Sequence, residues 1–475
     1  MKNRAPRLPQ LPKTRTGISG FDDVTAGGLP KGRPTLVCGG PGCGKTLFAA
    51  EFLVRGAVEF GEPGVFMAFE ETEEDLVKNV TSLGFDLKNL IAQKKVAVDF
   101  VRVERSEIEE TGSYNLDGLF IRLEHAVQET GAKRVVLDTV ESLFSGLSNT
   151  AVLRAELRRL FHWLKERRLT AVITGERGGE GTLTRQGLEE YVSDCVIMLD
   201  HRVREQMSTR RLRIVKYRGS THGTNEYPFI IDEEGLSVLP ITSLGLEHVA
   251  SDARVPTGVA QLDGMLGGKG YFKGSSVMLT GGAGTGKTSF AASFAASVCA
   301  AGQSCLFIDF EESPSQLIRN MRSVGVNLGV HHQKGRLQIL ASRPTVHGLE
   351  LHLVKLRKLV EKYKPAAVVI DPVSSLMSVG TTLDVQIMLT RIIDYLKLAG
   401  VTTVMTVLSD RSMDKVSSDV GVSSLIDTWI ALDHQEVGGQ RRRELRIIKS
   451  RGMAHSHQVL EFALTNGGVR LSPRG

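Results

Sequence analysis

GGPGCGKT, residues 39–46, recurs as GGAGTGKT at residues 281–288. Each copy follows an apolar run, PTLV or SVML, and precedes a stretch with helical spacing of its apolar residues. In the pattern G-x-x-x-x-G-K-T the glycines let backbone N–H groups turn toward phosphate oxygens at a helix N-terminus, and the lysine meets the β and γ phosphates. A Gly-rich turn before a helix can be merely structural. Because this one occurs twice in the same context, it predicts two nucleotide sites.

The phosphate-contacting residues of these two P-loops would be Gly42, Cys43, Gly44, Lys45, Thr46 and Leu47, and Gly284, Thr285, Gly286, Lys287 and Thr288. An aspartate ends a later apolar strand in each copy, Asp138 in VVLD and Asp371 in VVID. Such a carboxylate can hold the water shell of a metal bound to the phosphates, whereas a lone aspartate often only caps a turn. We therefore expect ATP with Mg²⁺ in both copies. The metal would be held by Thr46 and Asp138 in the first copy and by Thr288, Asp371 and Glu311 in the second.

The chain is a tandem duplication. TGISGFDDVTAGGLPKG, residues 16–32, recurs as TGVAQLDGMLGGKGYFKG at residues 257–274. Counted from the P-loop lysine, the spacings to the strand-ending aspartate (138 − 45 and 371 − 287) and to a Lys-x-Arg-Gly (216 − 45 and 449 − 287) are shorter in the second copy by the same nine residues. One net length change explains both differences, so these are two copies of one domain.

The pattern of apolar residues predicts the fold class. Short Val/Ile/Leu-rich runs alternate with longer helical segments, and in one of them Leu153, Leu157, Leu160, Phe161 and Leu164 share a helix face. Apolar strands separated by helices indicate an α/β protein with a mostly parallel sheet flanked by helices, and the end of each copy reads as hairpin strands. The expected division is a flexible arm at 1–13, a first P-loop NTPase domain at 14–240, a linker at 241–253 and a second domain at 254–475.

Composition sets few further limits. The 475 residues are 41% hydrophobic and 24% charged, with a formal charge of +6. Acidic and basic residues are mixed throughout, so nucleic acid is permitted as a partner but not implied, and we expect none. The five cysteines have no paired metal spacing, which argues against disulfides and zinc. With neither a signal peptide nor an apolar run long enough for a bilayer, a cytoplasmic protein without membrane contact is expected.

A glutamate pair follows the strand that we expect beside the P-loop strand. The pairs are Glu70 with Glu71 and Glu311 with Glu312. A carboxylate there can orient and deprotonate an attacking water or hydroxyl. Acidic residues are also favoured at a helix N-terminus for structural reasons. We expect one glutamate of each pair to be catalytic, and the sequence leaves open which one.

Cations recur on a late hairpin of each copy: Lys216 and Arg218, Lys449 and Arg451, and, six residues before each lysine, Arg210 and Arg443. A cation brought to the γ phosphate, often from another subunit, stabilises the transition state by on the order of a thousandfold. Basic residues on an edge strand also guard against aggregation. We expect the catalytic role, together with some edge protection at 441–443.

Several motifs together carry a family resemblance. FEET (69–72) and FEES (310–313), GLEEYVSDCVIML (187–199), and the paired KYRGSTH (216–222) and KSRGMAH (449–455) resemble the KaiC family of circadian-clock ATPases and autokinases. The resemblance covers nearly the whole chain, whereas plain RecA recombinases and replicative helicases have one such domain per chain. It implies two tandem RecA-like domains in a double-ring homohexamer, with ATP at every subunit interface. The first ring would hydrolyse ATP slowly, and the second would transfer phosphate to hydroxyls across the interface.

The resemblance also implies nucleotide contacts outside the P-loops, made by Ser82, Lys216, Tyr217, Arg218, Ser220 and His222 in the first ring and by Lys449, Ser450 and Arg451 in the second. Residues 111–138 resemble the region that a KaiB-like partner uses on the first ring. The sequence ends at SPRG, without the long tail through which the family's activator acts, so we do not expect that regulation.

Two adjacent serines distinguish the second copy. Aligning Asp194 with Asp427 places Ser423 opposite Glu190, and Ser424 opposite a tyrosine. A carboxylate cannot accept phosphate stably, so the aliphatic acceptors occur only in the second copy. The family's phosphorylated Ser-Thr pair falls at the same place, with serine here instead of threonine.

The resemblance therefore implies autophosphorylation of Ser423 and Ser424, with Glu311 taking the proton while Lys449 and Arg451 steady the phosphoryl group. On residue chemistry alone, a structural role of the two serines as turn or helix-cap hydroxyls is favoured over a role as phosphate acceptors. Two other functions stay open beside an autokinase. One is an ATP-gated scaffold without a kinase step, and the other is a DNA-acting ATPase related to RecA.

Overall fold

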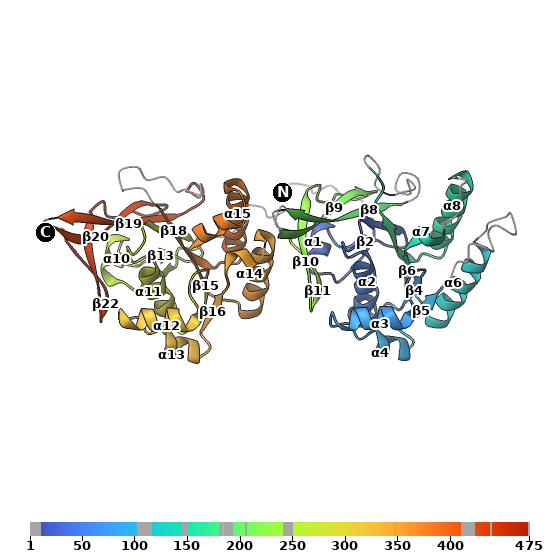
Figure 1. Ribbon diagram of the computed structural model, residues 1–475, viewed down its shortest axis with the longest axis horizontal. Helices are drawn as coiled ribbons and strands as arrows, with labels where there is room; N and C mark the ends of the chain where they lie inside the picture. The colour runs from blue at the N-terminus through green and yellow to red at the C-terminus, as the bar shows by residue number, and fades with distance from the viewer. Residues whose placement is uncertain are drawn as a thin grey trace, which may run out of the picture. The chain divides into compact units, whose positions relative to one another are not determined.

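The computed structural model describes residues 11–101, 116–143, 150–179, 184, 193–204, 207–240, 250–346, 348–409, 423–437 and 439–473. The chain divides into two compact units, Met1–Ser243 and Leu244–Gly475, called the first and second unit below (Figure 1). Within the described residues no helix is both long and apolar enough to cross a bilayer. All five cysteines are buried free thiols.

The first unit is built from alternating strands and helices. In chain order they are β1 (Lys13–Thr14), α1 (Phe21–Val24), β2 (Leu29–Pro30), β3 (Pro34–Gly39), α2 (Lys45–Glu59), β4 (Gly64–Ala68), α3 (Glu73–Thr81), α4 (Leu87–Ala92), β5 (Val96–Phe100), α6 (Asp117–Thr130), β6 (Arg134–Asp138), α7 (Val140–Leu143), α8 (Thr150–Glu166), β7 (Thr170–Glu176), β8 (Cys195–Arg204), β9 (Met207–Tyr217), β10 (Glu226–Asp232) and β11 (Gly235–Val238).

The second unit repeats this order. Its elements are β12 (Arg254–Val255), α10 (Ala260–Met265), β13 (Tyr271–Phe272), β14 (Ser276–Gly281), α11 (Lys287–Ala300), β15 (Cys305–Asp309), α12 (Pro314–Ser323), α13 (Leu328–Gln333), β16 (Leu337–Ala341), η2 (Pro344–Val346), α14 (Leu349–Tyr363), β17 (Ala367–Asp371), η3 (Val373–Ser378), α15 (Thr382–Leu398), β18 (Thr402–Leu408), β19 (Thr428–Val437), β20 (Gln440–Ser450), β21 (Leu460–Thr465) and β22 (Gly468–Pro473).

Each unit contains one nine-stranded sheet, and the two sheets have the same topology. The orders are β5-β4-β6-β7-β3-β8-β9-β10-β11 and β16-β15-β17-β18-β14-β19-β20-β21-β22. The strands from β5 to β8 pair in parallel, and β8 to β11 pair as antiparallel hairpins. The predicted α/β fold, with a mostly parallel sheet, flanking helices and terminal hairpins in each copy, is confirmed.

One expectation about this sheet is wrong. The strand before the glutamate pair, β4, does not lie beside the P-loop strand β3, because β7 and β6 stand between them. The second unit places β18 and β17 between β14 and β15 in the same way. The chain passes to the next strand through a long helical crossover, and such a connection can skip sheet positions that later strands fill.

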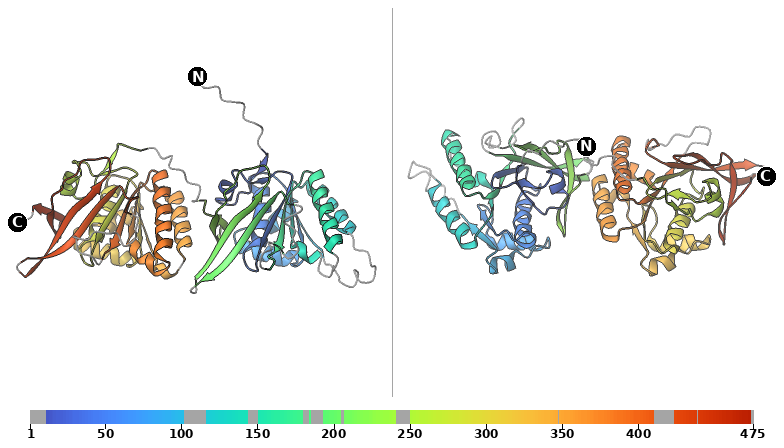
Figure 2. Two further views of the ribbon diagram at one scale, coloured as in Figure 1. Left: turned by 90° about the horizontal axis from the view of Figure 1, so that it is seen from above. Right: turned by 180° about the vertical axis from the view of Figure 1, so that it is seen from behind.

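Both faces of the first sheet are buried under helices (Figure 1, Figure 2). In β6, Val136 packs in the core that holds α2, while Val135 and Leu137 pack in the core that holds α6 and α8. Since successive strand residues point to opposite faces, an uninterrupted apolar run is what such a strand requires. The predicted helix face is also confirmed, because its five residues, Leu153, Leu157, Leu160, Phe161 and Leu164, are all buried in α8.

Candidate active site

Each P-loop connects a buried strand to the N-terminus of a long helix. Gly44 caps α2 at φ 102 and Gly286 caps α11 at φ 100, in the left-handed region that favours glycine. Lys45 Nζ donates to Gly39 O at 2.9 Å and to Gly40 O at 3.1 Å. Lys287 makes the same two contacts with its own loop, at 2.8 Å each. The two lysines thus lie inside loops of the same conformation, at helix ends suited to phosphate.

A cavity of about 280 Å³ opens in front of the first P-loop. Its walls come from the loop and from the glutamate segment with α3, and comprise Gly42, Gly44, Lys45, Thr46, Leu47, Glu71, Leu76, Asn79, Val80 and Leu83. The structure therefore brings the P-loop residues and Glu71 together around one space. Ser82, at the end of α3, is exposed and donates through Oγ to Asn79 O at 2.8 Å.

The strand-ending aspartates meet the P-loop threonines. Asp138 accepts hydrogen bonds from the hydroxyls of Thr46 and Thr174, and burial nevertheless raises its pKa. Asp371 has the same surroundings in the second unit, where Thr288 and Thr406 donate to it and burial again raises the pKa. Sequence reasoning missed Thr174 and Thr406, because a threonine inside a strand is ordinary, although the two occupy equivalent places in the two copies.

These surroundings fit Mg²⁺ bound together with nucleotide. The described residues hold no group of three or more His, Cys, Asp or Glu side chains that could hold a metal by themselves. One threonine hydroxyl and one carboxylate per unit are what Mg²⁺ uses when phosphates and waters supply its other ligands. In the second unit Glu311 lies close enough to influence Asp371 and Lys287, raising the pKa of both, although burial lowers that of Lys287 overall.

The hairpin cations of the second unit contact the main chain of the serine pair. Lys449 Nζ donates to Ser423 O, and Arg451 donates to Ser424 O at 2.6 Å. The Ser423 side chain is half-buried and Ser424 is exposed. Burial, followed by the charge of Arg451, lowers the pKa of Lys449. The predicted acceptors and two predicted cations therefore form one cluster.

The matching cluster of the first unit is described only in part, since Glu190 and Tyr191 lie outside the described residues. Burial, followed by the charge of Arg218, lowers the pKa of Lys216. Asp194 lies 2.7 Å from Lys165 and 3.9 Å from Arg218. The second unit repeats the first of these pairs with Asp427 and Lys397 at 2.8 Å. From the sequence, both aspartates served only to align the copies, whereas in the structure each pairs with a lysine near the C-terminal end of a helix.

Two of the residues predicted to contact nucleotide use their side chains for hydrogen bonds within their own unit. Tyr217 is buried and donates through its hydroxyl to Gly28 O at 2.8 Å. Ser450 shares a hydrogen bond of 2.9 Å with Thr428. The Tyr217 and Ser450 hydroxyls are thus already engaged in hydrogen bonds inside their own units. The Ser220 hydroxyl donates to a neighbouring carbonyl at 2.9 Å.

Other residues predicted to contact the nucleotide have buried polar atoms that make no hydrogen bond within the described structure. Within the described structure His222 Nδ1 and the Nε atoms of Arg210 and Arg443 are buried without a hydrogen-bond partner. The Cys43 thiol is buried, which raises its pKa, while Lys45 and Arg210 act in the opposite direction. Arg210 therefore reaches the vicinity of the first P-loop of its own unit.

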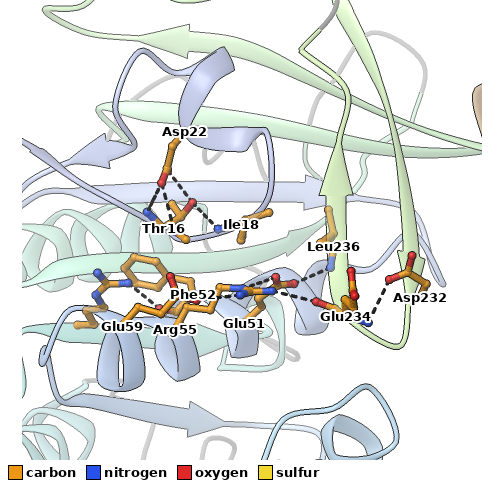
Figure 3. Close-up of polar contacts among 12 residues, drawn as sticks. Thr16, Ile18, Asp22, Glu51, Phe52, Arg55, Glu59, Asp232, Glu234 and Leu236 are labelled. Atoms are coloured by element: carbon orange, nitrogen blue, oxygen red, sulfur yellow. Dashed lines mark hydrogen bonds and ion pairs between the residues drawn. The ribbon is translucent and has the colours of Figure 1, made fainter. Parts of the chain in front are cut away.

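The helix after the first P-loop carries a charged network (Figure 3). Glu51 is fully buried in α2, and it accepts from Arg55 Nε at 2.7 Å and from Leu236 N in β11 at 2.7 Å. Arg55 also donates to Glu59 at 2.8 Å and to Glu234 O at 2.9 Å. Burial raises the pKa of Glu51 to about 7. The network ties the P-loop helix to the turn between β10 and β11.

Comparisons with known proteins match both units to one family. The model of the KaiC ATPase family matches residues 14–243 and again residues 255–475. The circadian clock protein KaiC2 of Synechocystis sp. is 55% identical over 463 residues, which are 97% of this chain and 81% of that protein. The circadian clock oscillator protein KaiC of Synechococcus elongatus is 37% identical over 460 residues, 96% of this chain and 88% of that protein. The protein of the same name from Parathermosynechococcus lividus is 37% identical over 466 residues, 98% of this chain and 86% of its own length.

Proposed function

Because the chain belongs to the KaiC family of ATPases, whose model matches both of its halves, we propose that it hydrolyses Mg-ATP and phosphorylates its own Ser423 and Ser424. One observation carries the kinase part of this proposal. Lys449 and Arg451 donate to the carbonyls of the two serines, so acceptor hydroxyls and phosphate-binding cations would reach a nucleotide together. Such a cluster serves phosphoryl transfer, where positioning and charge stabilisation supply most of the rate.

In the second unit the P-loop N–H groups and Lys287 would hold the triphosphate. Bound Mg²⁺ would neutralise phosphate oxygens, with the Thr288 hydroxyl and, through water, Asp371 holding it. A serine Oγ attacks the γ phosphorus, the bond to the β–γ bridging oxygen breaks, and ADP leaves. The hydroxyl proton passes to Glu311 as general base.

In the first unit a water would take the place of the serine. Lys45, Thr46 and Asp138 would hold the nucleotide and its metal in the same manner. Glu70 or Glu71 would receive the proton of the attacking water, and Lys216 with Arg218 would stabilise the charge that develops on the phosphate.

The assembly that completes these sites would be a homohexamer of double-ring form, with the hairpin of one subunit at the nucleotide of the next. A KaiB-like partner would dock on the first unit. The family membership supports both expectations, and the exposed side chains of Arg218 and Arg451 suit a hairpin that reaches the next subunit.

Incubation with γ-labelled ATP followed by phosphopeptide mass spectrometry tests the proposal. Label is expected on wild type and on Lys45→Ala, and it should be absent from Lys287→Ala and from Ser423→Ala/Ser424→Ala. Hydrolysis without any labelled serine would identify an ATP-gated scaffold instead. Salt-sensitive single-strand binding with DNA-stimulated hydrolysis would favour the DNA-acting alternative.

A further inference from the structure

The two glutamates of each pair are held by different partners. In the first unit Glu70 Oε1 accepts from Ser142 Oγ at 2.6 Å, and Glu71 Oε2 accepts from Asn79 Nδ2 at 3.3 Å. Ser142 belongs to α7, which follows the aspartate strand β6, whereas Asn79 belongs to α3. Neighbouring carboxylates are thus tied to different elements.

The second unit repeats both contacts. Ser375 Oγ donates to Glu311 Oε1 at 3.0 Å, and Asn320 Nδ2 donates to Glu312 Oε1 at 2.9 Å. The spacings are the same in the two copies: each serine follows its strand-ending aspartate by four positions (142 − 138 and 375 − 371), and each asparagine follows the second glutamate by eight (79 − 71 and 320 − 312).

The surrounding sequence makes this agreement informative. Between aspartate and serine the chain reads TVE in the first copy and PVS in the second, and between Glu71 and Asn79 it reads TEEDLVK where the second copy has SPSQLIR. Two segments that differ this much keep the same pair of side-chain contacts. An accidental surface hydrogen bond would have no reason to recur at both places.

The serine contact ties the first glutamate to the segment that follows the strand-ending aspartate. The serine lies one helical turn beyond the aspartate that meets the P-loop threonine. In the second unit Glu311 influences both Asp371 and Lys287, as described above. A hydroxyl that donates to one carboxylate oxygen fixes the rotamer of the glutamate and leaves the other oxygen available to accept a proton during the reaction.

A further contact occurs in the second unit alone. The Asp309 carboxylate accepts from the main-chain N–H groups of Glu311 at 2.8 Å and Glu312 at 2.7 Å. Ala68 occupies the matching position of the first unit. The unit that must transfer phosphate to a serine therefore holds the backbone of its glutamate pair as well as the side chains.

We propose that Ser142 and Ser375 are positioning residues, which hold Glu70 and Glu311 in the orientation that accepts the proton, while Asn79 and Asn320 hold the second glutamates by a separate contact, Glu71 in the wall of the first P-loop cavity. This inference rests on the proposed function, because it assigns the orientation of the base in each unit. Neither serine contacts the reacting atoms, and each acts through its glutamate.

The test uses the full chain and separates the units. Ser375→Ala is expected to lower the rate of label transfer to the serine pair about tenfold while the affinity for ATP stays the same, and Ser375→Thr should restore most of the rate. Ser142→Ala should lower hydrolysis similarly in a Lys287→Ala background, in which only the first unit turns over. Ser378→Ala is the matched control, because the Ser378 hydroxyl lies in the same turn and donates only to the carbonyl of residue 375, at 2.7 Å.

Rates of both alanine variants within twofold of wild type would overturn the inference, and so would a loss of ATP affinity that accounts for the lower rates. If wild type hydrolyses ATP but labels no serine, the autokinase proposal fails, and the Ser142→Ala result still decides the role of the serines. A wild type without hydrolysis would overturn both proposals.

Discussion

Substituting Glu51 gives the sharpest test of the energetics around the first P-loop helix. The carboxyl group is fully buried, and its two hydrogen-bond donors are Arg55 and the N–H of Leu236. Its pKa rises from 4.5 in the unfolded chain to about 7 in the folded unit, chiefly because burial disfavours the charged form. A raised carboxyl pKa means that the stability present below pH 4.5 is lost as the pH rises through 7.

The magnitude follows from the difference between the two pKa values. One pKa unit corresponds to about 1.4 kcal/mol, so the first unit should lose roughly 2 to 3 kcal/mol between pH 5 and pH 8 through this group. In Glu51→Gln the amide can still accept from Leu236 but does not titrate. The variant should therefore lack this part of the pH dependence.

Denaturant-dependent hydrogen exchange with mass spectrometry can measure this in the full chain, after correction for the intrinsic exchange rates. The free energy of opening of α2 peptides should fall more steeply with pH in wild type than in Glu51→Gln. Peptides from α11, where Ser293 occupies the matching position, serve as an internal reference. Glu59→Gln, which changes a partly exposed partner of Arg55, should keep the wild-type trend. Parallel pH curves for wild type and Glu51→Gln would refute the reasoning.

Three further outcomes are expected. Arg134→Leu should destabilise the first unit by about 3 kcal/mol or more, measured by thermal unfolding. The reason is that the Arg134 side chain is 1% exposed and donates hydrogen bonds to two carbonyls and one carboxylate. Gly270→Ala should lower the free energy of unfolding by roughly 2 kcal/mol or more, since φ at this position is +82 and the new Cβ would lie 2.2 Å from a carbonyl oxygen in β12. The control is Gly264→Ala in α10, where a Cβ meets nothing within 4 Å and should not destabilise the unit. Lys45→Ala and Lys287→Ala should each reduce bound ATP by one molecule per chain, measured by equilibrium dialysis.

The sequence predicted those features that depend on local pattern. Apolar runs defined the strands, and the P-loops, strand-ending aspartates and hairpin lysines recurred in the same order in both copies, with spacings that one length change of nine residues relates. The place of β4 in the sheet could not be predicted in this way, because the order of parallel strands depends on which positions the helical crossovers skip. Local residues say little about that choice.

The contacts around the site were harder to predict than its principal residues. Ser142 and Ser375 are ordinary polar residues in a short helix or turn, and their role appears only when each is seen against a carboxylate from another strand. A comparison of the two copies could have identified these serines as candidates, since each follows its strand-ending aspartate at the same spacing. Glu51 stands in an otherwise apolar helix, but only the folded hairpin shows what it contacts.

The buried charges around α2 also constrain how the two halves of the gene can exchange sequence. Glu51 and Arg55 in the first unit correspond to Ser293 and Ser297 in the second, so the pair belongs to one half alone. A recombination joint between those two positions would leave a buried acid without its cation, or the cation without its acid. Such hybrids would fold poorly, and selection against them would help tandem copies to diverge.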